Sequence, residues 1–422
     1  MPADGCSEPA RFLRIAATIY VVQLFRWARG GTLPIALNNS KGPCYIPLPR
    51  ASPKIMWGFM DKGGNLNWRP PRVAAVGCGN WGKNIARNLA RLGALHSICD
   101  PNPAVAAKIS GEFHIPAQTL AEVFDDPYCE AVALASPAAL HGEQVRLALE
   151  AGKHVFVEKP LALSAAVGYD LARLARQKSR VLMVGHLLHY HPHAVKLIDF
   201  VREGGLGELQ RIYARRLSPG KLRTEEDVMW SFAPHDVSVI LAMMGEVPKR
   251  VWAEGNAILN PSVLDMATIH MKFSSGTAAR IHVSWLNPYK EQRLVVVGSK
   301  ATAVFDDRAE WEDKLQIYDH DIVYRDGRPW TVKTDPIRFP LERREPLREE
   351  CVHFLHSVSS GTAPRTDSME AIGVLSVLDA AARSLTTGRH VAPKVFRALK
   401  ARARRPNRVA RRREPFALAL DS

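Results

Sequence analysis

Between residues 72 and 184, short apolar runs alternate with segments that carry apolar residues on one helical face. Runs of four to six apolar residues are typical of buried strands, and a period near 3.6 is typical of helices. The pattern predicts strands over 72–76, 94–99, 131–135, 154–157 and 181–184. It predicts helices over 83–92, 104–113, 119–124, 141–150 and 164–177. This alternation indicates an α/β fold with a parallel sheet and helices on both of its faces.

After about residue 205 the pattern changes and strands predominate. We expect strands over 209–215, 250–254, 268–273, 278–285 and 293–297. The segment Phe273-Ser274-Ser275-Gly276-Thr277 is typical of a hairpin turn between two of them. Two later segments, 347–359 and 368–387, have helical patterns, and we expect them to return to the first part of the chain.

The composition is that of an ordinary globular protein, but the charge is uneven. Of the 422 residues 46% are hydrophobic and 23% charged, which excludes a wholly disordered chain. The net charge of +15 is concentrated in residues 1–70, with nine Lys or Arg against three Asp or Glu, and in residues 393–422, with ten against two. The six cysteines form no CxxC pair, so we expect neither a zinc module nor a disulfide framework. Reduced cysteines are typical of the cytoplasm, where we expect the protein to lie.

Both basic ends differ from the body of the chain. We expect residues 1–70 to form a poorly structured extension. Its apolar stretch 15–24 is too short for a membrane span, which needs about 20 residues, but a membrane-surface helix or a targeting segment stays open. We expect a disordered tail over 393–422. It could contact phosphate backbones, but no aromatic residue interleaves its arginines, so we do not expect a nucleic-acid site.

The first predicted strand leads directly into the turn Gly77-Cys78-Gly79-Asn80-Trp81-Gly82 and then into a helix, which is the context of a dinucleotide-binding turn. Gly77 permits the tight turn, Gly79 lets the backbone approach a pyrophosphate, and Gly82 allows close helix packing. Asp100 ends the second strand, where a carboxylate suits the ribose hydroxyls of NAD and repels the 2′-phosphate of NADP. We therefore expect a Rossmann domain that binds NAD through this turn, Asn80 and Trp81 included, and through Asp100.

Further motifs resemble the Gfo/Idh/MocA family of oxidoreductases. They are Ala135-Ser136-Pro137 with His141, and the segment AGKHVFVEKP over 151–160. The resemblance covers about 71–392. It implies an NAD-binding domain over 71–190 and a substrate and oligomerisation domain over 191–392, an α+β domain whose large, mostly antiparallel sheet packs against another subunit. It also implies that a set of residues at the strand ends contacts the cofactor: Ser136, Pro137, His141, Glu158 and Lys159.

Three later segments are similar to the nucleotide-sugar branch of this family, which oxidises the 3-hydroxyl of UDP-N-acetylglucosamine or of its uronate. They are GHLLHYHP over 185–192, GKLR over 220–223 and WSFAPHDV over 230–237. Ser231, Ala233 and Ser238 stand where most of the family has the conserved residues of DxGxHxxD, which leaves His235 and Lys159 as the expected catalytic residues. The expected substrate-binding residues are His189, Tyr190, Arg216, Lys221, Arg223, Trp230 and Asp236.

The chemistry of alcohol oxidation fits these two catalytic candidates. A histidine, with an ordinary pKa near 6.5, suits the base that takes the hydroxyl proton. A lysine at a strand end can stabilise the developing alkoxide, and NAD takes the hydride. We place His235 at a helix entrance, after Pro234. The histidines at 186, 189, 191 and 193 have spacings that can ligate zinc, but without cysteine beside them we expect no metal.

The sequence leaves three functions open. The first is a UDP-sugar 3-dehydrogenase that forms homo-oligomers and feeds an aminotransferase, in amino-sugar synthesis for lipid A or surface polysaccharide. The second is a dehydrogenase of an inositol or a free sugar. The third is a non-catalytic regulator that senses a ligand through the cofactor fold.

Overall fold

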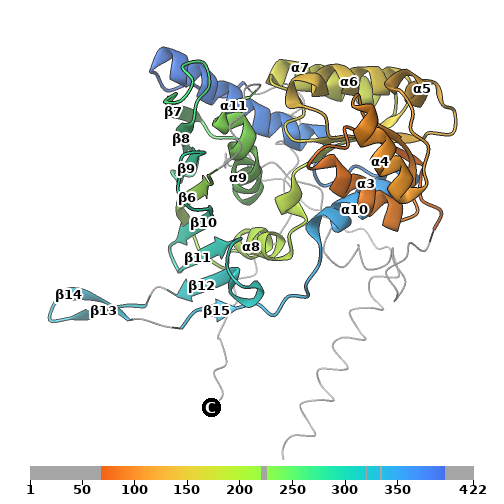
Figure 1. Cartoon of the computed structure of the whole chain (residues 1–422). Helices are drawn as coiled ribbons and strands as arrows, with labels where there is room; N and C mark the ends of the chain where they lie inside the picture. The colour runs from red at the N-terminus through yellow and green to blue at the C-terminus, as the bar shows by residue number, and fades with distance from the viewer. Residues whose placement is uncertain (1–67, 220–225, 320, 333–334, 395–422) are drawn as a thin grey trace, which may run out of the picture. The chain divides into compact units, whose positions relative to one another are not determined.

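The computed structural model describes residues 68–219, 226–319, 321–332 and 335–394 (Figure 1). The expected extension, up to residue 67, and the tail from residue 395 lie outside this part of the chain. Two sheets follow one another along the sequence, each with its own helices (Figure 1).

The first sheet is parallel, as predicted. Its strands are β1 (Val73–Val76), β2 (Leu95–Cys99), β3 (Ala131–Leu134), β4 (His154–Glu158) and β5 (Leu182–Gly185). They lie in the order β2-β1-β3-β4-β5, and all neighbours are parallel. The connecting helices are α3 (Gly82–Arg91), α4 (Pro103–Phe113), α5 (Leu120–Asp125), α6 (Ala138–Glu150) and α7 (Ala165–Gln177). The carboxyl ends of the five strands therefore share one edge, where such sheets bind ligands.

Polar side chains set the starts of these helices. Thr119 accepts a hydrogen bond from Glu122 N, and the Glu122 side chain accepts one from Thr119 N, a capping box that starts α5. Ser164 caps α7 by accepting from Ala166 N. α6 begins at Ala138 rather than at the predicted His141, since Pro137 takes the cap position.

The second sheet has eight strands and is mostly antiparallel, with one parallel pair, β6 and β9. The strands are β6 (Leu209–Leu217), β7 (Arg250–Asn256), β8 (Met266–Lys272), β9 (Ala278–Ser284), β10 (Glu291–Gly298), β11 (Ala301–Asp306), β12 (Leu315–Asp319) and β15 (Ile337–Arg338). β13 (Asp321–Arg325) and β14 (Arg328–Val332) form a separate hairpin (Figure 1). The α/β fold class with a second, mostly antiparallel sheet is confirmed.

Two helices on one face of this sheet were not predicted with the bounds that the structure shows. They are α8 (Pro192–Arg202) and α9 (Val228–Met244). The predicted helix entrance at Pro234 is wrong. α9 begins about two turns earlier, because Asp227 caps it by accepting from Trp230 N, and Pro234 lies inside the helix. His235 therefore projects from the body of a long helix, with nearly two turns of α9 before it.

The last two helices return to the parallel sheet, as expected. α10 (Pro346–Ser360) packs on α3, and α11 (Ser368–Thr387) spans from β7 to α7 (Figure 1). Between them the chain runs beside β5, where Val184 N donates to Thr366 O at 2.9 Å. The first turn of α11 is thereby fixed close to the carboxyl end of β5.

Candidate active site

Two glycines of the turn, Gly77 and Gly82, are packed against neighbouring atoms, whereas Gly79 faces open space. A Cβ on Gly77, whose φ is +80°, would lie 2.7 Å from Ser136 N, and one on Gly82 would lie 1.8 Å from Gly77 O. A Cβ on Gly79 would meet no atom within 4 Å. The turn can therefore tolerate no side chain at its packed positions, while its open backbone at Gly79 and the amino end of α3 fit a pyrophosphate.

Asp100 is held beside this turn. Its carboxylate accepts hydrogen bonds from Cys78 N at 2.7 Å and from Asn102 N at 2.9 Å. Two backbone donors keep the charge in place at the end of β2. This arrangement fits the two hydroxyls of the NAD ribose and opposes a 2′-phosphate.

Trp81 reaches from the glycine turn to the end of β4. Its Nε1 donates to Glu158 Oε1 at 2.6 Å, while the side chain as a whole is 42% exposed. Burial raises the pKa of Glu158, although Lys159 and the bond from Trp81 oppose this. Asn80, the neighbour of Trp81, is exposed. The two expected cofactor-binding segments are thus joined by one hydrogen bond across the strand ends.

His141 joins two other expected cofactor-binding segments. Its ring nitrogens lie 2.7 Å from Pro160 O and 2.8 Å from Ser136 O, and it is 1% exposed. Burial lowers its pKa. The Ser136 hydroxyl donates to Gln144, and Pro137 starts α6. His141 therefore links the segment that follows β3 to the segment that follows β4.

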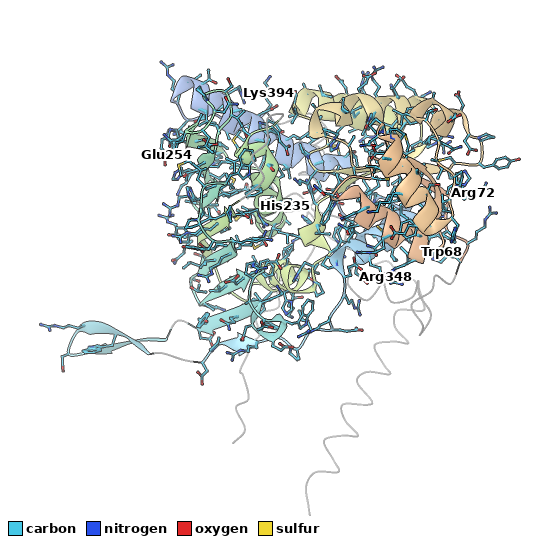
Figure 2. The ribbon with its side chains drawn as sticks, viewed as in Figure 1. Trp68, Arg72, His235, Glu254, Arg348 and Lys394 are labelled. Atoms are coloured by element: carbon cyan, nitrogen blue, oxygen red, sulfur yellow. The ribbon has the colours of Figure 1, made fainter. Side chains whose placement is uncertain are left out.

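Lys159 is brought to α9, the helix that carries His235. Lys159 follows β4 directly, and its Nζ donates to Ser231 O at 2.9 Å. Ser231 lies one turn before His235 on the same helix. Both side chains are half-buried, and His235 lies toward the middle of the described part of the protein (Figure 2). The structure thus gathers the two expected catalytic residues, which are 76 positions apart in the sequence.

The surroundings of His235 favour its neutral form. Burial lowers its pKa well below the ordinary value, and the positive charges of Lys159, Arg216 and His186 lower it further. A neutral imidazole is the form that accepts a proton.

Arg216 and Asp236, both expected to bind substrate, bind each other. Arg216 Nε lies 2.8 Å from Asp236 Oδ2, and its second nitrogen lies 3.1 Å from Oδ1. The residues are 7% and 3% exposed. This buried ion pair ties β6 to α9 at the residue next to His235, which is a positioning role.

The remaining expected substrate-binding residues do not form an exposed group. Those that the structure describes are buried or half-buried. His189, in the short helix η2 (Leu187–His189), is 2% exposed. Tyr190 is 3% exposed, and its hydroxyl contacts His353 Nδ1 at 3.0 Å. Trp230 is half-buried and packs against the cores of both regions. Lys221 and Arg223 lie outside the described residues.

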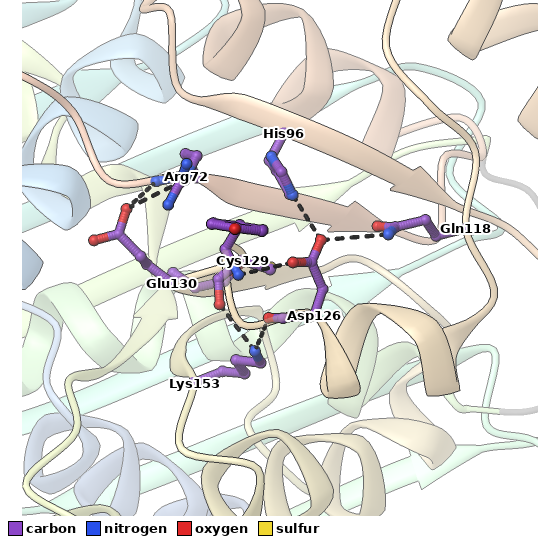
Figure 3. A network of polar contacts seen from close by, with 9 residues as sticks. Arg72, His96, Gln118, Asp126, Cys129, Glu130 and Lys153 are labelled. Carbon is purple, nitrogen blue, oxygen red and sulfur yellow. Dashed lines mark hydrogen bonds and ion pairs between the residues drawn. The ribbon is translucent and has the colours of Figure 1, made fainter.

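The lysine of the AGKHV segment has a structural place at the opposite edge of the sheet. Lys153 Nζ donates to Asp126 O at 2.6 Å and to Cys129 O at 2.9 Å (Figure 3). The Asp126 carboxylate accepts from His96 at 2.8 Å, and this bond is the largest cause that lowers its pKa to about 2. This network closes the amino end of the sheet.

Two searches of the described residues bear on other classes of protein. Within them no helix is long and apolar enough to cross a membrane. The same part of the chain holds no cluster of three or more His, Cys, Asp or Glu side chains placed to hold a metal ion.

Two family models match the chain in sequence. One describes an oxidoreductase family with an NAD-binding Rossmann fold and matches residues 71–186. The other describes the GFO/IDH/MocA C-terminal domain and matches residues 194–304. Together they span most of the two sheets.

Named relatives agree with these models. The UDP-N-acetylglucosamine 3-dehydrogenase of Acidithiobacillus ferrooxidans is 28% identical over 68% of this chain and 89% of its own length. The myo-inositol 2-dehydrogenase of Thermotoga maritima is 27% identical over 76% of this chain and 98% of its own. A solved structure of the Acidithiobacillus ferrooxidans enzyme, GnnA, matches with a TM-score of 0.65 and 25% identity, over 74% of this chain and 97% of that one.

The open glycine turn with Asp100, the parallel sheet that carries them and both family models lead to one assignment. The protein is an oxidoreductase of the Gfo/Idh/MocA family with an NAD-binding Rossmann domain.

Proposed function

We propose that the protein oxidises the 3-hydroxyl of a UDP-N-acetyl-hexosamine, UDP-N-acetylglucosamine or its uronate, to the 3-keto sugar. The observation that carries this proposal is the bond from Lys159 Nζ to the turn of α9 that precedes His235. This bond holds Lys159, at the end of β4, against the helix that carries His235. Both residues thereby lie beside the strand ends that form the expected NAD site. The choice of sugar is supported by the similarity to the Acidithiobacillus ferrooxidans enzyme.

His235 and Lys159 divide the proton chemistry in this proposal. NAD, when bound, would supply the hydride acceptor for the carbon that carries the hydroxyl. His235, kept neutral by burial and by the positive charges around it, takes the hydroxyl proton. Lys159 donates a hydrogen bond to the same oxygen and stabilises its developing negative charge.

Residues at the carboxyl edge of the parallel sheet would hold the cofactor. Gly79 and the amino end of α3 would receive the pyrophosphate, and Asp100 would accept hydrogen bonds from the ribose hydroxyls. The bond between Trp81 and Glu158 spans the strand ends and would fix one wall of the cofactor site.

An inositol or free-sugar dehydrogenase is the second candidate, and a specific contact favours it. Arg216, one of the cations expected to bind a diphosphate, is engaged by Asp236 instead. The myo-inositol 2-dehydrogenase of Thermotoga maritima is also similar in sequence. A polyol has no phosphate charge and needs no such arginine.

A substrate panel separates these candidates. The protein is incubated with NAD and UDP-N-acetylglucosamine, its uronate, myo-inositol or glucose, and NADH absorbance is followed. An aminotransferase with glutamate removes the keto product. NADH from one UDP-sugar alone supports the proposal, and NADH from myo-inositol alone selects the second candidate. NAD binding without turnover of any of the four compounds contradicts the proposal for UDP-N-acetylglucosamine and its uronate, and it favours an untested sugar or a sensing role.

Variants of one residue type test the assignment of Lys159. Lys159→Met removes the charge and should abolish NADH formation while NAD still binds. Lys178→Met is the matched control, since Lys178 is an exposed lysine at the end of α7. Full activity in Lys159→Met would contradict the proposed role of this lysine.

We also propose that a second copy covers the outer face of the large sheet. Tyr213 on β6 is 41% exposed on this face, beside Arg280 of β9. Light scattering that finds a monomer at micromolar concentration would contradict this.

A 3-keto sugar product would suit an aminotransferase as the next enzyme, for an amino sugar of lipid A or surface polysaccharide.

A further inference from the structure

One half of the outer face of the large sheet is strongly basic. The helices α8, α9 and α11 pack on the inner face (Figure 1). On the outer face, the neighbouring strands β7, β8, β9 and β6 each carry an exposed cation, and these are Arg250, Lys272, Arg280 and Arg211. The proposed mechanism uses none of them.

The register of the strands places these cations side by side. Arg250 of β7 lies directly opposite Lys272 of β8. The same row continues through Ala278 of β9 to Arg211 of β6. Arg280 follows two residues after Ala278 on β9, so it faces the same side of the sheet. Like charges directly opposite each other destabilise a sheet, and an anion held between them would remove this cost.

The four cations line one hollow in this face, which we call the basic hollow. It has a volume of about 370 Å³, and Tyr213, His270 and His390 contribute its other polar side chains. Within the described residues, no Asp or Glu belongs to its lining. Ala278, in the middle of the row, has a side chain too short to fill the space between its long neighbours. The hollow is therefore both open and positively charged.

The contacts that these cations make within the chain are with neutral groups. Arg211 and Lys272 each donate to a backbone carbonyl oxygen, and Arg280 lies over an aromatic ring. Glu254, the acidic residue of β7, lies 3.9 Å from His270 instead. In the part of the chain that the structure describes, no carboxylate therefore neutralises the basic hollow.

The rest of the outer face limits the size of the ligand. Arg215 lies 3.8 Å from Glu291, and Arg293 lies 2.7 Å from Asp306, so the next arginines along the sheet are paired. Further along, β10 and β11 present half-buried valines. The cations without a carboxylate thus form a compact group and not a long track. Such a group fits a short anion with several charges, and arginine binds phosphate oxygens in a bidentate manner.

We propose that the basic hollow binds a small molecule that carries a di- or triphosphate. Its four strands span three spacings of about 4.8 Å, roughly 14 Å, across which long side chains can close on such a group. The site lies on the face opposite α9, so the proposal goes beyond the proposed function and does not rest on it. A second copy has the valines of β10 and β11 to pack on, whereas closing it over the hollow would bury these cations and require the anion.

Calorimetry of the full chain with inorganic tripolyphosphate tests the proposal. We expect one site per chain at physiological salt, with weaker binding of orthophosphate. The double variant Arg250→Gln/Arg280→Gln should weaken binding at least about tenfold, since it removes two charged donors. Arg404→Gln/Arg405→Gln is the matched control, because it removes the same charge from the basic tail, and it should leave the affinity unchanged. Equal binding of ATP assigns the site to the polyphosphate itself and tighter binding to a nucleoside that carries it, and either result supports the proposal.

Chemical labelling locates the ligand without a measurement of activity. Acetic anhydride acetylates exposed lysines, and mass spectrometry measures the rate at each. Tripolyphosphate should slow the acetylation of Lys272 and leave that of Lys178, an exposed lysine at the end of α7, unchanged.

Three results would overturn the proposal. The first is an equal loss of affinity in the two double variants. The second is acetylation of Lys272 at the same rate with and without tripolyphosphate. The third is a single-stranded oligonucleotide that binds more tightly than tripolyphosphate and loses its affinity in Arg250→Gln/Arg280→Gln, which would assign the hollow to nucleic acid. The oxidation of a sugar is measured separately, so failure of the proposed function leaves each of these results distinct.

Discussion

The buried ion pair of Arg216 and Asp236 makes it possible to predict how much Asp236→Asn lowers the free energy of unfolding. The two donor distances are 2.8 and 3.1 Å, and the side chains are 8% and 4% exposed. Asp236→Asn keeps the shape of the side chain but leaves the guanidinium buried without its anion. Removing one partner of a buried pair costs about 3–5 kcal/mol. Because asparagine still accepts one hydrogen bond, we expect the free energy of unfolding to fall by about 3 kcal/mol.

The assay is urea unfolding followed by circular dichroism, with the melting temperature as a second measure. A loss of about 3 kcal/mol corresponds to a fall of roughly 6 °C in a domain of this size. The double variant Arg216→Met/Asp236→Leu should recover most of the loss, because apolar residues of similar volume replace buried pairs well. Arg293→Met is the control, since Arg293 pairs with Asp306 at 2.7 Å but is 48% exposed, and it should scarcely change the midpoint.

Two results would contradict a stabilising role of the Arg216–Asp236 pair. A loss below about 1 kcal/mol in Asp236→Asn would mean that the pair is not the closed contact of the structure. A higher KM for the sugar with unchanged stability would return Arg216 to the substrate-binding role that the sequence predicts.

Three further predictions follow from other contacts. Asp100→Ala should lower the Kd for NADP relative to that for NAD, measured by calorimetry, and an unchanged ratio would contradict the role of Asp100. Glu350→Leu should raise the melting temperature, because both oxygens of this fully buried carboxyl lack a hydrogen-bond partner among the described residues; a lower melting temperature would indicate that the carboxyl is needed. The pKa of Asp126 is lowered to about 2, so its stabilisation is present above about pH 4 and lost as the pH falls toward 2. Asp126→Asn should therefore flatten the acid-unfolding profile over that range, and an unaltered profile would refute this.

The Rossmann part of the fold could be predicted because its signals are local. The glycine turn, the apolar strands and the caps at Thr119 and Ser164 lie within a few residues of the elements they define. β11 and β12 were missed although they are no shorter than the strands of the first sheet. β11 pairs with β10 and β12 pairs with β11, and strand formation depends on such partners more than on the local sequence. α9 was misplaced because a proline marks a first turn more often than a helix interior.

The candidate site could be predicted only in part, for a related reason. The family motifs indicated Lys159 and His235 as catalytic candidates. Nothing in the sequence shows that Arg216 forms an ion pair with Asp236. The pair of His186 and Glu370 joins positions 184 residues apart, so it exists only once α11 lies beside β5. Tyr190 stands in a polar motif, but its hydroxyl finds partners in the core.

Transfer of the hydride from C3 of the sugar to the cofactor is the defining event of the proposed reaction, and isotope labelling measures it. UDP-N-acetylglucosamine deuterated at C3 is incubated with NAD and the protein, and the reduced cofactor is examined by mass spectrometry. We predict deuterium in the reduced cofactor with wild-type protein and none with Lys159→Met. Reduced cofactor without deuterium, or deuterium retained in full on the sugar, would contradict the claim that this chain oxidises the 3-hydroxyl.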